Sequence, residues 1–369
     1  GYSDKQFGAN SFYSPKFPNQ YEHTRRAAAS LRGDLGSSRL RLLPTLYWDH
    51  EFDRFNLIKG STIGQNHHIV NNYGAGLIMN YSSILGTTTL AGELRYEEVV
   101  GNKLGTPRSK PESYYTKHGS RFNTNLSLEH TVKLDKWLIS AGGLLSHNSL
   151  LKDKYNFLPS VSINYHPLDR WSFVATWSKS MRLPTFNDLY YLRIGNTGLR
   201  PEQADEYNVG VTWSAAPDRI ADQVSITVDG YYNEVRDKIV AFPSTYVWKM
   251  ANFGRVRITG LDASLTAGMP LNAKLRLALN ASYTYQHAID VTNPEKKNYR
   301  NQIPYTPRHS GSGSVALSTP WIDAAYTLVA VSDRYFLSQN LPQNRINGYA
   351  EHTLALSRSF ILRRGTELR

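Results

Sequence analysis

Aromatic and basic side chains in the polar stretches of this sequence are the ones best suited to hold a ligand. Rings of Tyr, Trp and Phe with scattered Arg guanidinium groups suit an amphipathic ligand of moderate size. Each ring has an alternative role, which is packing against a neighbouring loop or lying at the headgroup level of a membrane. We interpret the following as candidate ligand-binding residues: Tyr190, Tyr191, Arg193, Tyr246, Trp248, Tyr299, Arg300, Tyr335 and Phe336.

Residue types that support catalysis or tight metal binding are sparse. The 369 residues include no Cys, which excludes disulfides, thiolate metal sites and a Cys nucleophile. No G-x-S-x-G, Walker or H-E-x-x-H pattern is present. His67 and His68 are adjacent, and adjacent residues of a strand point to opposite faces, so they are poorly placed to bind one ion. We therefore assign no catalytic residue, metal or cofactor and predict a protein that is not an enzyme.

The chain is basic, with a formal net charge of +12. Its positive residues are scattered, without a run of about five or six like charges, so no nucleic-acid partner is expected. The excess instead suits contact with anionic lipopolysaccharide, or it reflects acidic segments outside this chain. No apolar stretch reaches the ~18–20 residues of a membrane-spanning helix, and the polar start, GYSDKQFGAN, has no signal-peptide core.

The elements that must position the candidate residues are long strands, because the dominant pattern has a period of two. In QVSITVDGYY, from Gln223, apolar Val224, Ile226 and Val228 alternate with polar residues. AKLRLALNASYTY, from Ala273, alternates in the same way. The strands run mostly to about 10–15 residues, which exceeds the usual length in soluble sheets and suits a tilted crossing of a bilayer.

The connections between these strands are alternately short and long. We predict strands over 22–32, 39–51, 68–81, 87–98, 119–132, 136–147, 157–166, 170–181, 204–214, 222–234, 255–268, 273–287, 307–318, 321–333 and 346–360, with a sixteenth beginning near 366. The long connections are 52–67, 99–118, 148–156, 182–203, 235–254, 288–306 and 334–345. Short turns at one end and long loops at the other are typical of a transmembrane β-barrel. The sequence therefore predicts an all-β fold, a large antiparallel transmembrane β-barrel.

Tryptophans support this orientation. Trp137, Trp171, Trp213 and Trp321 each lie within a few residues of a short turn, where the periplasmic aromatic girdle of a barrel belongs. The alternative is a large soluble all-β protein such as a propeller, which would repeat at about 40–50 residues, and the sequence shows no such repeat.

Two neighbouring stretches carry a family resemblance. SKSMRLPTFNDLYY, from Ser178, and GNTGLRPEQADEYNVGV, from Gly195, resemble segments in the C-terminal half of TonB-dependent outer-membrane receptors. The matching positions are Ser178, Arg182, Pro184, Thr185, Leu189, Tyr190, Asn196, Leu199, Pro201, Glu202, Tyr207 and Gly210. The sequence departs from the pattern with Asp188 for Glu, Thr197 and Gly198 for Pro and its neighbour, and Asn208 for Glu.

Two further segments extend the resemblance. NFGRVRITGLDASL, at 252–265, is similar to a family segment, with Asp262 in its acidic position. GANSFYSPKFPNQYEHT, at 8–24, resembles cobalamin-receptor-like members of Bacteroidetes type.

The resemblance implies a barrel of about 22 strands around an N-terminal plug. Residues 1–369 would then be the barrel domain, with about 16 strands present, truncated at both ends and lacking the plug and the final strand. It also implies residence in the bacterial outer membrane among lipid and lipopolysaccharide, contact with TonB–ExbB–ExbD through the plug, and a surface lipoprotein lid in some relatives.

The implied function is import of a scarce nutrient captured by extracellular loops. The narrower resemblance indicates cobalamin or another corrinoid. The alternatives are a ferric siderophore, haem or glycan receptor, a passive porin-like channel, and a barrel with adhesive or enzymatic loops.

The motif residues are interpreted as structural: Arg182, Pro184, Pro201, Glu202, Glu206 and Gly210. Arg182 and Glu206 share the lumen-facing parity of their strands, so we expect them to pair across strands or to contact the plug. The alternative is that they only stabilise the barrel wall.

Overall fold

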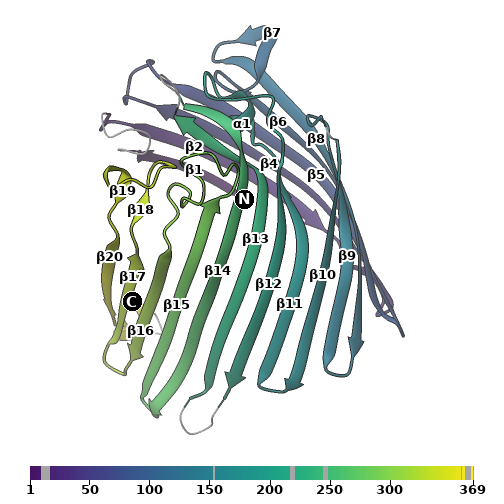
Figure 1. Ribbon diagram of the computed structural model, residues 1–369, viewed down its shortest axis with the longest axis vertical. Coiled ribbons are helices and arrows are strands. Elements are labelled where there is room, and N and C mark those ends of the chain that lie inside the picture. Colours follow the sequence, from purple (N-terminus) through teal and green to yellow (C-terminus); the bar gives the residue numbers. More distant parts are fainter. Residues whose placement is uncertain are drawn as a thin grey trace.

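The structure, a computed structural model, describes residues 1–9, 17–152, 154–216, 221–243, 248–358, 360–361 and 367–368. They form an 18-stranded antiparallel sheet that curls into a barrel wall (Figure 1). Its strands are β1 (Tyr2–Gly8), β2 (Tyr21–Arg32), β3 (Leu35–Gly36), β4 (Leu40–Asn56), β5 (Asn66–Ser83), β6 (Gly86–Gly101), β7 (Thr106–Glu112), β8 (Tyr115–Leu134), β9 (Trp137–Asn148), β10 (Tyr155–Leu168), β11 (Trp171–Arg182), β12 (Glu202–Ala215), β13 (Gln223–Pro243), β14 (Trp248–Asn272), β15 (Leu275–Asp290), β16 (His309–Ser318), β17 (Asp323–Val331) and β20 (Tyr349–Ser357).

The long strands form a meander in which each pairs with its neighbours in the sequence. The pattern continues without interruption from β9 to β20. Among the described residues, β1 and β20 are the edges of this sheet. Small elements lie outside it: helix α1 (Phe186–Tyr190), the 3-10 helix η1 (Pro342–Asn344), and the pairs β18 (Arg334–Tyr335) with β19 (Arg345–Ile346) and β21 (Phe360–Ile361) with β22 (Glu367–Leu368).

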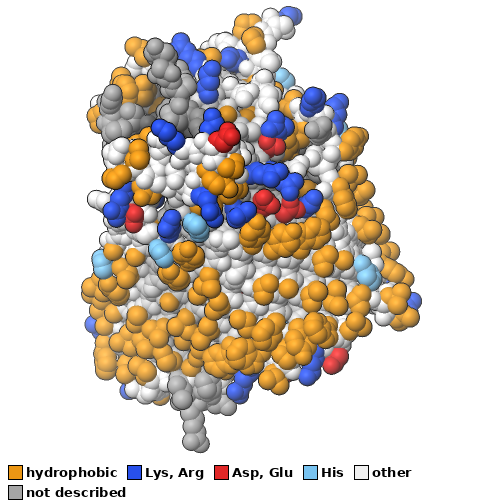
Figure 2. All heavy atoms as spheres, in the orientation of Figure 1, with side chains coloured by type: hydrophobic (Ala, Val, Ile, Leu, Met, Phe, Trp, Pro, Cys, Tyr) orange, Lys and Arg blue, Asp and Glu red, His pale blue; other side chains and the backbone are white. Residues whose placement is uncertain are grey.

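The register gives the wall an apolar outer face and a polar inner face. Trp171 lies opposite Trp213 and Phe173 opposite Val211, which places apolar residues side by side on one face. Ser172, on the other face, lies opposite Thr212. Figure 2 shows the resulting band of apolar side chains on the outer surface. Water-exposed apolar strands of this length are costly, so the band is the part of the wall that faces lipid.

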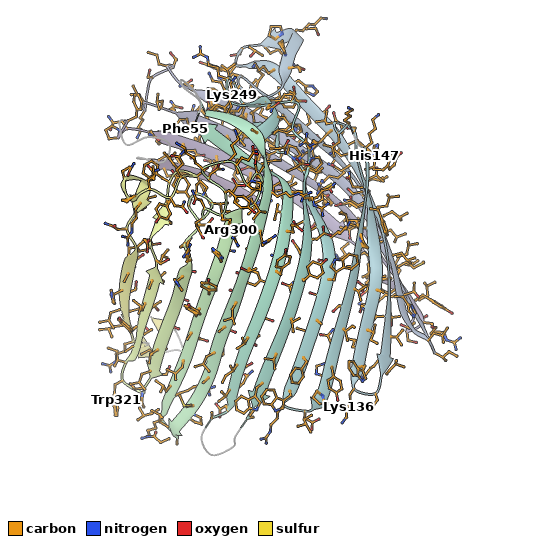
Figure 3. The ribbon with its side chains drawn as sticks, in the orientation of Figure 1. Phe55, Lys136, His147, Lys249, Arg300 and Trp321 are labelled. Atoms are coloured by element: carbon orange, nitrogen blue, oxygen red, sulfur yellow. The ribbon has the colours of Figure 1, made fainter. Side chains whose placement is uncertain are left out.

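The end of the barrel with short turns carries aromatic residues. Trp321 and Lys136 lie at this end in Figure 3, far from Arg300 and Lys249 at the other. Trp137 begins β9 and stacks on Tyr165, with ring centroids 4.2 Å apart. Interfacial Trp and Tyr mark where lipid meets water. Because such barrels have short turns on the periplasmic side, this end is the periplasmic one and the long loops are extracellular.

The expected strands up to 346–360 are confirmed, with four main differences. β7 (Thr106–Glu112) lies in the connection expected at 99–118 and pairs with β8. β1 was not expected, because YSDKQFG has no apolar face to reveal its alternation. The strand expected near 366 is described only as β22, which pairs with β21 apart from the main sheet. Residues 235–254, expected as a loop, largely extend β13 and β14, which pair up to Pro243 and Trp248.

The extension of β13 and β14 was missed because the apolar residues change face there. Val235 and Val256 lie opposite each other on the inner face and are buried, with Ala204 and Ile258 packed against them. The lower part of these strands is apolar on the outside, so the change of parity looks like the end of a strand. No helix in the described part of the chain is long and apolar enough to cross a bilayer.

Candidate functional site

The extracellular connection between β11 and β12, residues 183–201, carries three of the candidate residues, and we call it the strap. Its first turn is helix α1, and Thr185 is the N-cap. Thr185 Oγ1 accepts a hydrogen bond from the amide of Asp188 at 3.1 Å, and Asp188 Oδ2 accepts one from the amide of Thr185 at 2.9 Å. This reciprocal capping box satisfies two helix-terminal donors and fixes where the chain leaves β11.

The base of the strap is closed by an ion pair between β11 and β12. Arg182 lies directly opposite Glu202, and its Nη2 donates to Glu202 Oε1 at 2.8 Å. Its Nη1 lies 3.4 Å from Asp188 Oδ2, which ties the ion pair to α1. Glu202 Oε1 also accepts from the amide of Ile239 at 2.6 Å. Burial acts to raise the pKa of Glu202, but the hydrogen bonds from Arg182 and Ile239 outweigh it and hold that pKa below its usual range.

The expected pairing of Arg182 with Glu206 is wrong. In the register of β11 and β12, Glu206 lies opposite Ser178, four residues from Arg182. Glu206 accepts hydrogen bonds from Ser180 Oγ at 2.8 Å and from Ser178 Oγ at 3.4 Å. Arg182 and Glu206 do lie on the lumen-facing side of their strands, as their parity predicted.

A small apolar cluster holds the strap down on β13 and β14. Leu189 and Leu199, from the two halves of the strap, are buried together with Ile239 of β13. Tyr190 and Met250 pack against this cluster. Apolar side chains buried in this way stabilise the folded loop, so Tyr190 has a structural role here.

The far side of the strap is bonded to strands that are not its neighbours. Arg121 of β8 donates from Nη1 to the carbonyl oxygen of Pro184 at 2.6 Å, and its guanidinium carbon lies 4.8 Å from the centroid of the Phe186 ring. Tyr191 Oη accepts from Asn66 Nδ2 of β5 at 3.1 Å. Because β9 and β10 separate β8 from β11, the strap reaches across the inside of the extracellular mouth (Figure 1).

Arg121 belongs to a polar chain that the sequence did not reveal. Asn148 Nδ2 donates to Asn123 Oδ1 at 2.5 Å, and Asn123 Nδ2 donates to Glu97 Oε2 at 3.0 Å. Glu97 also forms an ion pair with Arg121. Asn123 is only 2% exposed, and buried polar groups that are fully paired give a rigid arrangement. The lumen-facing parity of these residues was the one signal available in the sequence.

Two other extracellular loops are bonded to each other. The backbone amide of Gln302 donates to Asn340 Oδ1 at 2.7 Å, and Asn340 Nδ2 donates to the backbone carbonyl of Gln302 at 3.0 Å. The amide of Tyr305 donates to the carbonyl of Tyr335 at 2.7 Å. Residues 291–308 and 332–348 therefore act as one unit above β15 to β20, and we call them the interlocked loops.

The candidate ligand-binding residues fall into separate groups. On the strap, Tyr191 is half-buried and Arg193 is exposed, with a φ of 70°. In the interlocked loops, Arg300 and Phe336 are exposed, and the half-buried residues are Tyr299 and Tyr335. Within the described residues, no hydrogen bond, ion pair or ring contact joins the two groups. Tyr246 lies outside the described residues, as does the side chain of Trp248, whose backbone begins β14.

The adjacent histidines at the top of β5 form no metal site. His67 stacks on Tyr114 at 4.1 Å between centroids, and its Nε2 lies 3.1 Å from Gln65 Oε1. His68 faces the lumen opposite Asp53. Burial, with the charges of His67 and Lys103, lowers the pKa of His68 to about 4, so it is neutral at physiological pH. No cluster of three potential ligands occurs among the residues that the structure describes.

Lower in the lumen, the resemblance segment 252–265 has a packing role. A Cβ on Gly260 would lie 2.3 Å from Tyr231 Cζ and 2.5 Å from the carbonyl oxygen of Tyr285. Only Gly allows this approach of the Tyr231 ring to the wall. Asp262 lies opposite Asp229 on the same face, so the middle of the lumen presents two carboxylates.

A meander of long strands, apolar outside and polar inside, with short turns at one end and large loops at the other, is the wall of an outer-membrane β-barrel. Residues 1–361 match the family described as TonB dependent receptor-like, beta-barrel, and the chain belongs to this family. Its place is the outer membrane of Gram-negative bacteria. The expectations from the family resemblance about fold and localisation are thus confirmed.

The relatives found by sequence and the solved structures with a similar fold transport different ligands. The vitamin B12 transporter BtuB of Vibrio vulnificus is 26% identical over 195 residues, which are 50% of this chain and 28% of that protein. The vitamin B12 transporter BtuB of Photobacterium profundum is 24% identical over 286 residues, 71% of this chain and 43% of that protein. The ferric enterobactin receptor PfeA of Pseudomonas aeruginosa superposes with a TM-score of 0.68 at 16% identity, covering 94% of this chain and 55% of that one.

These relatives differ in what they support. The chain spans less than half the length of the two transporters and about half that of the solved receptor. The likeness to PfeA shows the fold alone, because so low an identity carries no information about a ligand.

Proposed function

We propose that this chain forms the barrel of an active-transport receptor that captures a corrinoid, such as cobalamin, at its extracellular mouth. The observation that carries the proposal is the match to two vitamin B12 transporters, one of which extends over 71% of the chain. The strap supports a receptor with a shaped mouth in preference to an open porin-like channel, since it is bonded at both ends. A ferric siderophore, haem or glycan is the alternative cargo.

We propose that the ligand contacts are the exposed members of the candidate set. Arg193 on the strap and Arg300 and Phe336 on the interlocked loops remain accessible. Tyr190 and Tyr191 are committed to packing and to the bond with Asn66. Exposed Arg guanidinium groups together with an exposed aromatic ring suit a large ligand with both apolar and anionic groups.

For import, we propose that residues 1–369 are the barrel domain of a longer receptor in which a plug fills the lumen. The polar inner wall, including Asp229 and Asp262, offers that plug hydrogen-bonding and charged partners. TonB, with ExbB and ExbD, would act on the plug, and a surface lipoprotein would cap the mouth if this receptor follows the relatives that have one.

The test is calorimetry of the intact receptor in detergent with cyanocobalamin, with ferric siderophores as the comparison set. Tight binding of the corrinoid alone, weakened by Arg193→Ala or by Arg300→Ala, supports the cargo and the proposed contacts. Binding of a ferric siderophore and not of the corrinoid by the folded receptor overturns the cargo and leaves the family unaffected.

A further inference from the structure

The last strands of the barrel wall continue upward into the interlocked loops with a break between them. Arg334 of β18 lies opposite Ile346 of β19, and lower down Val331 of β17 lies opposite Tyr349 of β20. Both pairs belong to the same register, so β17 and β18 form one hairpin with β19 and β20 (Figure 1). The break consists of residues 332–333 on one side and residues 347–348 on the other.

Asn347 and Gly348, which lie in this break, are both exposed. They are the one Asn–Gly step in the sequence. Among the described residues, neither the side chain of Asn347 nor the backbone amide of Gly348 takes part in a hydrogen bond. The peptide bond between them is therefore not held by the paired strands above and below it.

The packing of the hairpin requires glycine at position 348. A Cβ on Gly348 would lie 2.6 Å from the carbonyl oxygen of Val331, a backbone atom that cannot move away. Because glycine has no Cβ, its amide nitrogen is also the one that a preceding side chain reaches most easily. The close approach that demands glycine thus leaves the side chain of Asn347 beside an unshielded nitrogen.

We propose that Asn347 is a site of spontaneous deamidation. The deprotonated backbone nitrogen of Gly348 attacks Cγ of Asn347 and forms a bond to it, and the bond from Cγ to Nδ2 breaks with release of ammonia. Water then opens the resulting succinimide ring at either of its two carbonyl carbons and leaves an aspartate or an isoaspartate. Water is the one co-reactant, and the proposal is independent of the transported ligand.

The structure separates Asn347 from another step of similar chemistry. Asn148 precedes Ser149, a small residue that also permits such an attack, but Asn148 is only 2% exposed. Its Nδ2 donates to Asn123 Oδ1 at 2.5 Å, and the amide of Ser149 donates to the carbonyl of Phe122 at 3.0 Å. Both reacting groups are held in place there, so Asn148 should be protected where Asn347 is not.

The carboxylate formed at position 347 would face a like charge. In the register of the hairpin, position 347 lies opposite Asp333, whose carboxylate is paired with Arg345 Nε at 3.1 Å. Like charges at opposite positions of a sheet destabilise it. An isoaspartate also adds a carbon atom to the main chain of the hairpin. Deamidation should therefore loosen the interlocked loops, in which the amide of Tyr305 donates to the carbonyl of Tyr335.

The test of the site is peptide mapping by mass spectrometry of the intact receptor in detergent, incubated in mildly alkaline buffer. We expect the deamidated form to accumulate at Asn347 several-fold faster than at Asn148. The rate should rise with pH, because the attacking nitrogen must lose its proton. Asn347→Gln lengthens the side chain, so ring closure and the release of ammonia should become much slower at this position.

The test of the consequence uses Asn347→Asp, which supplies the product directly. The amide of Tyr305 should exchange with solvent several-fold faster in this variant than in the wild type, because exchange follows local opening. Gln343→Glu is the matched control, since it makes the same charge change in the same loop but lies in η1, outside the paired strands.

An unmodified Asn347 after prolonged incubation would overturn the proposed site, and so would equal conversion at Asn347 and Asn148 in the folded receptor. Equal exchange of the Tyr305 amide in Asn347→Asp and Gln343→Glu would overturn the proposed effect on the interlocked loops.

Discussion

Arg121 of β8 donates a hydrogen bond to the carbonyl oxygen of Pro184, which lies 63 residues later in the chain. The same guanidinium forms an ion pair with Glu97 and lies against the ring of Phe186. One side chain therefore joins the far wall of the barrel to the strap. The loop that carries Arg193 is thus held at the mouth by a residue of a strand that is remote in the chain.

Replacing Arg121 should free the strap. Arg121→Met removes the bond to Pro184 and leaves the half-buried carboxylate of Glu97 with Arg95 and Asn123 as partners. We expect tryptic cleavage after Arg193 to become several-fold faster in the folded receptor, because cleavage follows local opening. Arg108→Met is the matched control, since within the described part of the chain the Arg108 side chain bonds only the nearby carbonyl of Tyr115. Equal cleavage rates in the two variants would show that Arg121 does not restrain the strap.

Acid should loosen the base of the strap through Glu202. Its folded-state pKa lies below the ordinary Glu value of 4.5. A carboxyl with a lowered pKa stabilises the folded state fully above its unfolded pKa and loses that contribution as the pH falls through the folded pKa. The amide of Ile239, which donates to Glu202, should therefore lose hydrogen-exchange protection as the pH is lowered below this value.

Glu202→Gln is the control for this acid effect. The side-chain amide of Gln keeps an acceptor for Ile239 but cannot titrate. The hydrogen-exchange protection of the Ile239 amide, relative to that of a neighbouring strand amide, should therefore not change over the same pH range. An identical acid-induced loss of protection in the variant and the wild type would exclude Glu202 as its origin.

A substitution at Gly260 should destabilise the wall where one at Gly230 does not. A Cβ at Gly260 meets a backbone oxygen that cannot move away, whereas at Gly230 the nearest atom is 3.9 Å distant. We expect Gly260→Ala to cost about 1–3 kcal/mol, in line with overpacked sites, and Gly230→Ala to be close to neutral. The temperature at which the gel band of the folded receptor disappears measures the stability of both variants. A Gly260→Ala receptor as heat-resistant as Gly230→Ala would contradict the packing argument.

Alternation in the sequence was sufficient to predict the barrel because lipid on one side and polar lumen on the other impose a strict period of two. It failed at Val235 and Val256, where the inner face becomes apolar under loops that no local pattern describes. Helix α1 was not predicted because five residues are too few to show a helical period, although the sequence contains its capping residues Thr185 and Asp188.

The site was less predictable than the fold, since its contacts join residues far apart in the chain. Asn66 and Tyr191 are 125 positions apart, and no spacing in the sequence brings them together. The sequence therefore identified the loops that carry candidate residues but could not separate Tyr190, which packs, from Arg193, which is exposed.

The exposed arginine of the interlocked loops should contribute to ligand affinity. Arg300 lies at the top of β15 in Figure 3, and its backbone is fixed by a bond from its amide to the carbonyl of Asp290 at 2.7 Å. Its side chain can be removed without disturbing that bond, so Arg300→Ala should lower the affinity for an anionic ligand, such as a phosphate-bearing corrinoid, about tenfold with the loop intact. Lys297→Ala, exposed in the same loop, should have little effect because a flexible ammonium gives less directional binding. Calorimetry on both variants decides the matter, and equal losses would mean that the loop attracts the ligand by net charge alone.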